Sequence, residues 1–334
     1  MAGTGRGQIW MSRPGLPCVV GPGRLSKLLL AAAGIALCLL LPGCRDPFGA
    51  YMAQGVALAR QGQYNLAISS FNEAIAINPD DPRVYYNRAL TYRLMGEYEL
   101  AIADYSKAIE LKPDFAEAYG NRGIAHRYQG DYDRAIKDYS KALALNPLDA
   151  RTYFNRALAF RHKQDYAQAA VDYTKAIRIQ PDFAEAYANR GLTYWRMGEQ
   201  DRAIEDYTKA IETKPDFAEA FFNRGLLYHQ KGQYDLAIED YTKTIELDPH
   251  HADAYCYRGF LQHHKGRYDL AIEDYSRAIA IDPNHAEAYS NRGLAYHYMG
   301  MYDKAREDFE MAQKIRDEIQ AEPAGDYERP APTE

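Results

Sequence analysis

A period of 34 residues constrains the fold of this chain more than any other feature of its sequence. A proline recurs at one phase of the period, and an alanine recurs twelve residues before each proline. The prolines are Pro79, Pro113, Pro147, Pro181, Pro215, Pro249 and Pro283, and the alanines are Ala67, Ala101, Ala135, Ala169, Ala203, Ala237 and Ala271. A fixed period of this size is the mark of a repeat array, whose stacked units bury a continuous core. We therefore predict one stack of eight units from Phe48 to about Ile319, although a globular chain of 334 residues would suggest two domains.

Each unit contains residues that end one helix, start a second helix and then end it, as in a helical hairpin. In the third unit a proline-free stretch ends at Gly130, which can adopt the positive φ of a helix end. Asp131 or Asp133 can then cap a second helix. Pro147 stops that helix, because proline lacks an N–H and restricts the residue before it. The glycine recurs in every unit except the fourth, where Gln164 leaves a different turn open.

Small and large residues alternate where the two helices of a unit must meet. Gly123 and Ala135 permit a close approach, and Tyr139 fills the space beside them. This pattern resembles the tetratricopeptide repeat. The resemblance implies an all-α fold: a right-handed superhelix of eight 34-residue helix-turn-helix repeats, with the first helix of each repeat on a concave face. The expected repeats are residues 48–81, 82–115, 116–149, 150–183, 184–217, 218–251, 252–285 and 286–319, and a Pro- and charge-rich tail, 320–334, is expected to be disordered.

Residues 1–44 have the pattern of a signal peptide. The apolar stretch Leu28–Leu41 is too short to cross a ~30 Å hydrocarbon core as a helix, and Arg24 and Lys27 precede it. It ends in Leu-Pro-Gly-Cys, which resembles the bacterial lipobox, although Pro42 departs from the usual small residue. The resemblance implies that Cys44 is lipidated.

A lipidated Cys44 would place the repeats close to a bilayer on the periplasmic face of a bacterial membrane. By resemblance to enteric sorting, Arg45 at the next position favours the outer membrane. The alternatives are a soluble secreted or periplasmic protein and an uncleaved signal anchor.

Charge and cysteine content exclude other classes of protein. The formal charge is −6, and residues 1–44 hold four basic residues and no acid, so the remainder carries −6 − 4 = −10. A partner with a phosphate backbone needs a basic face, so we expect no nucleic acid partner. Cys256 is the one cysteine within the repeats, so no internal disulfide framework is expected there.

An arginine and an aspartate recur together, sixteen residues apart. The arginines are Arg88, Arg122, Arg156, Arg190, Arg224, Arg258 and Arg292, and the aspartates are Asp104, Asp138, Asp172, Asp206, Asp240, Asp274 and Asp308. The first unit lacks both residue types, with Gln54 and Ser70 in their places. We therefore expect an Arg–Asp pair that braces adjacent helices, and not a binding stripe.

A second series precedes those arginines by one residue and consists of Asn87, Asn121, Asn155, Asn189, Asn223 and Asn291, with Tyr257 as the exception. In the family that the chain resembles, an asparagine here usually faces the concave groove. In the O-linked N-acetylglucosamine transferase family a similar ladder holds the backbone of an extended peptide. The resemblance implies the same role here, since an amide both donates to and accepts from a peptide unit. The alternative is a solvated or inter-repeat hydrogen-bonding row.

A third series lies five residues after each arginine and changes along the array, through Arg93, Arg127, Arg161, Trp195, His229, His263 and His297. We expect a basic N-terminal half of the groove and a more acidic and aromatic C-terminal half, which could orient a bound chain. Individually solvated side chains are the alternative. Histidines of successive units stand about 8–10 Å apart, too far for one zinc ion, so no metal site is predicted.

The periodic pattern accounts for the repeats, and no phosphate-binding glycine loop or detached Ser/His/Asp set accompanies it. We therefore predict a scaffold without catalytic activity or cofactor, which binds an extended peptide or protein partner and reaches the membrane through a lipid anchor. A self-associating assembly element and a regulatory subunit of a separate enzyme are the alternatives.

Overall fold

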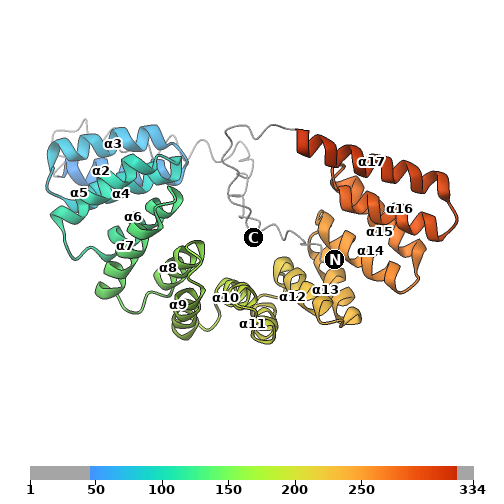
Figure 1. Ribbon diagram of the computed structural model, residues 1–334. Coiled ribbons are helices and arrows are strands. Elements are labelled where there is room, and N and C mark those ends of the chain that lie inside the picture. Colours follow the sequence, from blue (N-terminus) through green and yellow to red (C-terminus); the bar gives the residue numbers. More distant parts are fainter. Residues whose placement is uncertain (1–45, 322–334) are drawn as a thin grey trace. The chain divides into compact units, whose positions relative to one another are not determined.

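The computed structural model describes residues 46–321. The predicted signal peptide, with Cys44, and residues 322–334 of the predicted tail lie outside the described residues. Within them the chain forms sixteen α-helices and no strand, which confirms the predicted all-α repeat fold (Figure 1). The helices belong to two compact units, whose described parts are residues 46–215 and 216–321.

The first unit holds five helical hairpins. Their first helices are α2 (Pro47–Arg60), α4 (Pro82–Met95), α6 (Ala116–Tyr128), α8 (Ala150–His162) and α10 (Ala184–Arg196). Their second helices are α3 (Tyr64–Ile77), α5 (Tyr98–Leu111), α7 (Tyr132–Leu145), α9 (Tyr166–Ile179) and α11 (Gln200–Thr213).

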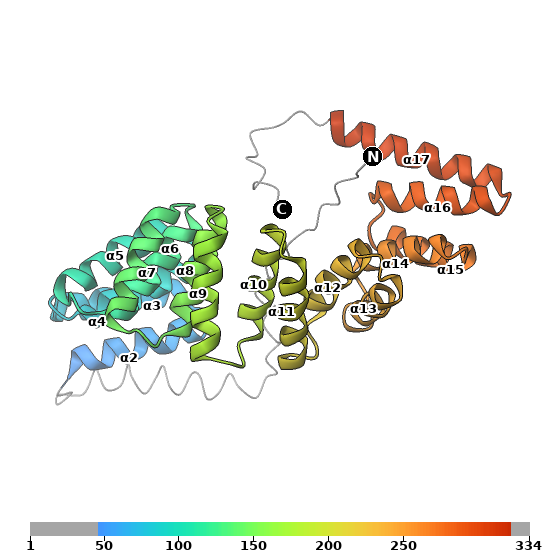
Figure 2. The same ribbon diagram turned by 60° about the horizontal axis from the view of Figure 1, so that its bottom comes forward.

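The second unit holds three hairpins of the same kind. They are α12 (Ala218–Gln230) with α13 (Tyr234–Leu247), α14 (Ala252–His264) with α15 (Tyr268–Ile281), and α16 (Ala286–Tyr298) with α17 (Tyr302–Ala321). The two helices of the last hairpin lie side by side in both views (Figures 1 and 2). No helix of the described part of the chain is long and apolar enough to cross a bilayer.

The turn inside each hairpin depends on one residue with a positive φ. Gly130 has φ 77°, and the corresponding glycines of the other units lie between 72° and 83°. Gln164 does not change this turn, because it adopts φ 61° in the fourth unit. A side chain in this conformation costs roughly 1–2 kcal/mol, which the packing of the helices on either side can outweigh.

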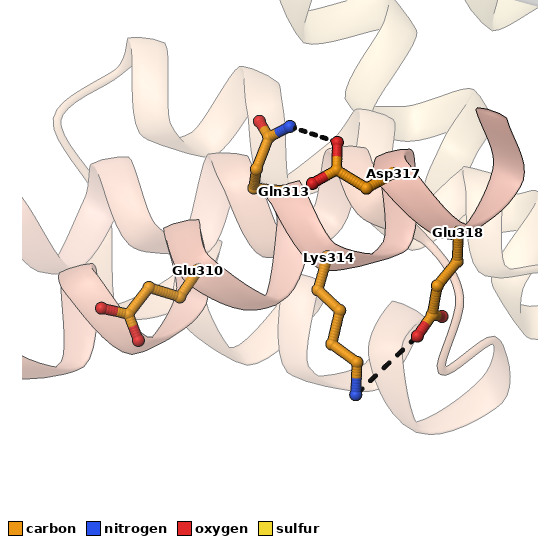
Figure 3. Close-up of a pocket in the computed structure, with 5 residues that line it drawn as sticks. All are labelled: Glu310, Gln313, Lys314, Asp317 and Glu318. Atoms are coloured by element: carbon orange, nitrogen blue, oxygen red, sulfur yellow. Dashed lines mark hydrogen bonds and ion pairs between the residues drawn. The ribbon is translucent and has the colours of Figure 1, made fainter. Parts of the chain in front are cut away.

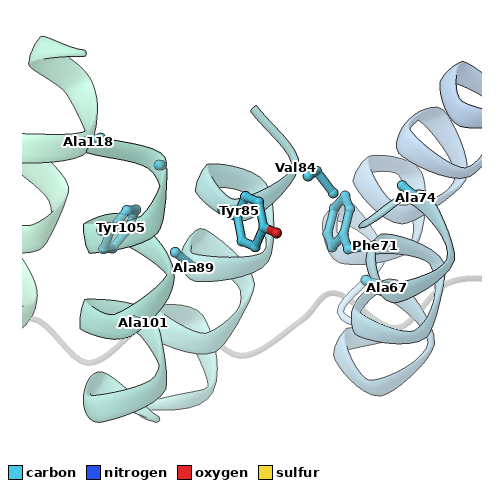
Figure 4. Packing of buried hydrophobic residues seen from close by; sticks show 10 residues of the cluster. Ala67, Phe71, Ala74, Val84, Tyr85, Ala89, Ala101, Tyr105 and Ala118 are labelled. Carbon is cyan, nitrogen blue, oxygen red and sulfur yellow. The ribbon is translucent and has the colours of Figure 1, made fainter. Parts of the chain in front are cut away.

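The core confirms the packing expected at the close approaches. All seven recurring alanines, from Ala67 to Ala271, are fully buried. A Cβ added at Gly123 would lie 2.8 Å from the ring of Tyr139 and 3.2 Å from the carbonyl oxygen of Ala135, so even a methyl group here would require the ring or the helix to shift. Figure 4 shows the same interleaving of alanines with aromatic rings in the first repeats.

Within each unit the first helices lie on the inner side of the bend. In the first unit α2 contacts α4, α4 contacts α6 and α6 contacts α8, and no comparable contact joins neighbouring second helices of the described chain. In the second unit α14 and α16 contact each other in the same way. Figure 1 shows α8 on the inner side and α9 on the outer side of the first unit.

The last helix ends the array with a polar surface. In α17, Ala305, Ala312 and Ile315 are buried against the stack, whereas Arg306 and Gln313 are exposed, as expected for a capping repeat. A shallow hollow on this helix contains polar groups that satisfy one another (Figure 3). Its Gln313 amide donates to Asp317 at 2.7 Å, and Lys314 pairs with Glu318 at 3.8 Å.

Candidate functional site

The recurring arginines bind the recurring aspartates, which confirms the structural interpretation of this pair. In every one of the seven pairs the arginine Nε donates to one carboxylate oxygen and Nη2 donates to the other, at 2.6–2.9 Å. The aspartate side chains are 2–9% exposed. Each pair joins the two helices of one repeat, so these arginines are not available to a ligand.

A third hydrogen bond from these arginines was not predicted from the sequence. In six of them Nη1 donates to a side chain sixteen residues earlier, on the second helix of the preceding repeat. The acceptors are Asn72, Ser106, Ser140, Thr174, Thr242 and Ser276. The sequence carries a signal for this contact, because a small polar residue recurs at that phase. Each such arginine therefore ties three helices together.

The predicted asparagine series occupies one face of the first helices, and each amide is half-buried. The Nδ2 groups of Asn87, Asn121 and Asn189 donate to the carbonyl oxygen four residues earlier in their own helix, at 2.8–2.9 Å. Asn121 also donates to the hydroxyl of Tyr86 in the preceding repeat, at 3.1 Å. An inter-repeat hydrogen bond, the alternative role for this series, thus exists at Asn121. The amide oxygens of these three residues accept no hydrogen bond from residues 46–321.

Arg93, Arg127 and Arg161 lie on α4, α6 and α8, each six residues after the asparagine of its helix. They are half-buried, and none of them forms an ion pair within residues 46–321. The buried Nε groups of Arg93 and Arg127 have no hydrogen-bond acceptor in the same part of the chain. These arginines differ in this respect from the paired ones, although both kinds stand on the same helices.

A row of buried tyrosine hydroxyls accompanies these arginines and was not predicted. The hydroxyls of Tyr105, Tyr139, Tyr173, Tyr207 and Tyr241 have no hydrogen-bond partner within the described residues. Burial raises the pKa of Tyr139 to about 12, and the Arg127 guanidinium beside it works against this rise. Arg93 acts in the same way on Tyr105, and Arg161 on Tyr173. The signal in the sequence is tyrosine, and not phenylalanine, at the most buried aromatic position of these repeats.

The later members of the third series are aromatic and pack against other rings. Trp195 is half-buried in α10, and the Arg196 guanidinium lies 5.7 Å from its ring centre. His229 packs on Phe260 at 5.4 Å, and His263 packs on Tyr298 at 5.3 Å between ring centres. Burial lowers the pKa of both histidines, so both are neutral at neutral pH.

The described residues can also be compared with the requirements of a metal site and of a nucleophilic cysteine. Within residues 46–321 no group of three or more His, Cys, Asp or Glu side chains could hold a metal ion. Cys256 is 5% exposed, and burial raises the pKa of its thiol, which disfavours the nucleophilic thiolate. His285, near it, caps α16 by accepting the Ala288 N–H at Nδ1.

Comparisons with known proteins identify the repeat. A family model described as TPR repeat matches residues 55–96, 158–198, 196–232 and 263–300. Two models described as tetratricopeptide repeat match residues 82–115, 116–148, 218–251 and 286–318, and residues 240–273. No match was found among curated protein sequences.

One solved structure shows the same fold, and two others are similar over about half of this chain. The C-terminal part of a TPR repeat-containing protein from Cytophaga hutchinsonii is 21% identical, with a TM-score of 0.61 over 72% of this chain and 98% of that chain. MamA is 30% identical, with a TM-score of 0.47 over 49% of this chain and 96% of that chain. YrrB, described as a TPR protein with an unusual peptide-binding site, is 27% identical, with a TM-score of 0.48 over 55% of this chain and 95% of that chain.

Proposed function

Because this chain belongs to the tetratricopeptide repeat family, we propose that it is an interaction scaffold whose first helices hold an extended segment of a protein partner. One observation carries the proposal. The first helices repeat an asparagine, an apolar residue and a third residue at three-residue spacing, which places all three on one helix face. In α6 these residues are Asn121, Ile124 and Arg127. We call this surface the first-helix face.

The amides of this face suit a peptide backbone. Where Nδ2 is bonded to its own helix, as in Asn121 and Asn189, the amide oxygen is left to accept an N–H from a ligand. A peptide backbone supplies such donors at regular intervals whatever its side chains are. The asparagines therefore support binding of an extended chain, while neighbouring residues choose its sequence.

The test is crosslinking mass spectrometry on intact cells, with the native chain compared with a variant in which Asn121, Asn155 and Asn189 are changed to Ala. We expect a partner crosslinked to the first helices of the native chain and lost in the variant. A control variant changes three exposed amides away from this face, Asn65, Gln168 and Gln180, to Ala and should keep the partner. Thermal unfolding must show both variants to be folded.

Other outcomes would change the function. Crosslinks to second helices only, or to other copies of the chain only, would contradict a ligand on the first-helix face and favour a self-associating assembly element. An enzyme as the crosslinked partner would make the chain a regulatory subunit. In either case the scaffold is proposed to lack catalytic activity of its own.

We further propose that a lipid on Cys44 anchors the scaffold to a bacterial membrane, with the outer membrane favoured over the inner membrane. The support is the leader sequence with its lipobox-like end, together with the start of α2 at Pro47, three residues beyond Cys44. A lipid at Cys44 would therefore keep the first repeat near the bilayer surface.

Replacing Cys44 by Ala should release the chain from the membrane fraction of disrupted cells, because the acylated side chain is removed. The control is Cys38→Ala, which changes another cysteine of the same leader and should leave the chain in the membrane fraction. Membrane association that survives Cys44→Ala would remove the lipid anchor and leave the uncleaved signal anchor as the explanation.

A further inference from the structure

Three cations of the first-helix face lack an acidic partner. Arg93, Arg127 and Arg161, which we call the arginine row, form no ion pair within residues 46–321, whereas the paired arginines of the same helices are saturated. A guanidinium carries five N–H donors and no acceptor, so each member of the row presents donors that the fold does not use.

The groups around the row include buried polar atoms whose hydrogen bonds the fold leaves incomplete. Arg93 and Arg127 lie near enough to the hydroxyls of Tyr105 and Tyr139 to oppose the rise of their pKa, but no hydrogen bond of good geometry joins these buried groups, and the Tyr173 hydroxyl has no partner within the described residues either. Burying a hydroxyl without a hydrogen bond lowers the stability of the fold, and phenylalanine at the same place would avoid this cost. The first repeat does avoid it, because it has Phe71 in place of the tyrosine and Ala59 in place of the arginine. The first repeat thus lacks both groups, whereas the fifth and sixth repeats keep the hydroxyls of Tyr207 and Tyr241 and have Trp195 and His229 in place of the arginine.

Beside the row, the face carries apolar residues and a few other charges. Between the asparagine and the arginine of each helix lies an apolar residue, Leu90, Ile124 or Leu158, and each is half-buried. Four residues before each asparagine the helices carry Arg83, Glu117 and Arg151, and Arg83 is already paired with Asp81, so Glu117 stands against Arg151 and the three arginines of the row. Its charge therefore favours an anionic ligand.

The spacing of the row selects a backbone conformation. Neighbouring packed helices stand about 8–10 Å apart, and α4, α6 and α8 contact one another in this order. A polyproline II segment advances about 3.1 Å per residue with three residues per turn, so every third side chain points the same way at a spacing of about 9 Å. In a β-strand the third side chain along would point to the opposite side.

We propose that the arginine row binds an acidic, extended segment of the partner protein, whose glutamates recur at every third residue and pair with Arg93, Arg127 and Arg161 in turn. This inference rests on the proposed function, since it assigns the chemistry of the segment that the scaffold holds. The amide and the guanidinium of one helix are six residues, or about 9 Å, apart along the axis. A backbone on the asparagines can reach the row through glutamate side chains that cross the apolar residues.

A peptide accounts for this surface better than a nucleic acid does. A nucleic acid needs a basic surface for its phosphates, but the chain beyond residue 44 carries a net negative charge and the row supplies only three cations. Three apolar side chains also lie where the phosphates would have to bind. A glutamate side chain has an apolar stem and a charged end. With its backbone on the asparagines, the stem would contact the apolar residue and the carboxylate would reach the arginine.

The first test measures fluorescence anisotropy of a labelled peptide of repeated Glu-Pro-Ala units with the native chain. We expect saturable binding that weakens as salt is raised, because the pairs are partly exposed. The matched probes are a Gln-Pro-Ala repeat and a peptide of the same composition with its glutamates adjacent. Both should bind at least about 10-fold more weakly, since each lacks either the charge or the spacing. Equal binding of either probe would overturn the proposal without any variant of the protein.

The second test changes the row itself. Arg93→Gln, Arg127→Gln and Arg161→Gln together should weaken the Glu-Pro-Ala peptide by about 10- to 100-fold, as expected for three ion pairs of modest strength. A control of equal charge change, Lys137→Gln with Lys141→Gln and Arg178→Gln, alters exposed residues of the second helices and should bind as the native chain does. The row variant loses no ion pair of the fold, and its far-ultraviolet circular dichroism should be native.

The remaining outcomes separate this inference from the scaffold function. The inference is contradicted if the row variant binds the acidic peptide as tightly as the native chain does. It is also contradicted if a single-stranded oligonucleotide, added at an equal concentration of negative charge, displaces the peptide. If crosslinking in cells finds a partner on the first-helix face whose bound segment is not acidic, the scaffold function stands and this inference falls. If no partner reaches that face, both fall.

Discussion

Arg190→Ala is expected to lower the free energy of unfolding by about 3–5 kcal/mol, because it leaves the Asp206 carboxylate buried without its counter-charge. Asp206 is 5% exposed and accepts two bonds from Arg190, at 2.7 and 2.8 Å. The same substitution also removes the donor to Thr174 of the preceding repeat. Urea denaturation followed by circular dichroism measures the loss.

The pH dependence of this loss has a definite sign. Burial raises the pKa of Asp206 and Arg190 opposes the rise, so Arg190→Ala should raise that pKa further. An acid whose pKa is higher in the folded state than in the unfolded state destabilises the fold as pH rises through its folded pKa. Arg190→Ala should therefore cost less at mildly acidic pH than at neutral pH.

Arg83→Ala provides the control for this prediction. Arg83 also makes a bidentate pair, with Asp81, but its side chain is 69% exposed, so the expected loss is about 0–1 kcal/mol. Equal losses for Arg83→Ala and Arg190→Ala would show that burial does not decide the strength of these pairs.

Tyr275→Ala is expected to cost about 3–5 kcal/mol, whereas Phe309→Ala, at the same place in the next repeat, should cost less than half as much. Both rings lie against a glycine of their own hairpin, Gly259 and Gly293. Tyr275 is 1% exposed because another repeat covers it, and its removal leaves a closed cavity. Phe309 is 38% exposed, so water fills the space that its removal leaves.

Denaturant unfolding of the full chain compares these two variants directly. The m-value should stay the same, so that the shift in midpoint reports stability. If Phe309→Ala were as costly as Tyr275→Ala, the outer face of α17 would be covered in solution, and a second copy of the chain would be the first candidate for the cover.

Much of this fold follows from the sequence because its signals are steric and repeat at a fixed phase. Gly130 and Pro147 mark the ends of two helices, and the pairing of Arg122 with Asp138 followed from the joint recurrence of the two residue types. The contact of Arg122 with Ser106 did not follow, because serine, threonine and asparagine exchange freely as acceptors and the alternation hides the pattern.

The candidate site was predicted less completely. The sequence places Asn121 and Arg127 on one helix face, but the burial of the Arg127 Nε and the Tyr139 hydroxyl depends on how neighbouring helices cross. Helix crossing is set by the packing of whole helices and not by the local sequence. The conformation of Gln164 was equally open, since a strain of about 1 kcal/mol is small beside the burial around it.

The arginine that ties three helices has a consequence for how such a chain can change its length. Its partners stand sixteen residues before it and sixteen after it, so they depend on phase within a repeat and not on position in the chain. Loss of residues 116–149 would place Ser106 where Arg156 now meets Ser140, one serine for another. Gain or loss of whole repeats thus preserves every such joint, while any other length breaks the phase. The number of repeats therefore sets the length of the binding surface. Duplication of a single unit lengthens the partner segment that the surface can hold by one repeat.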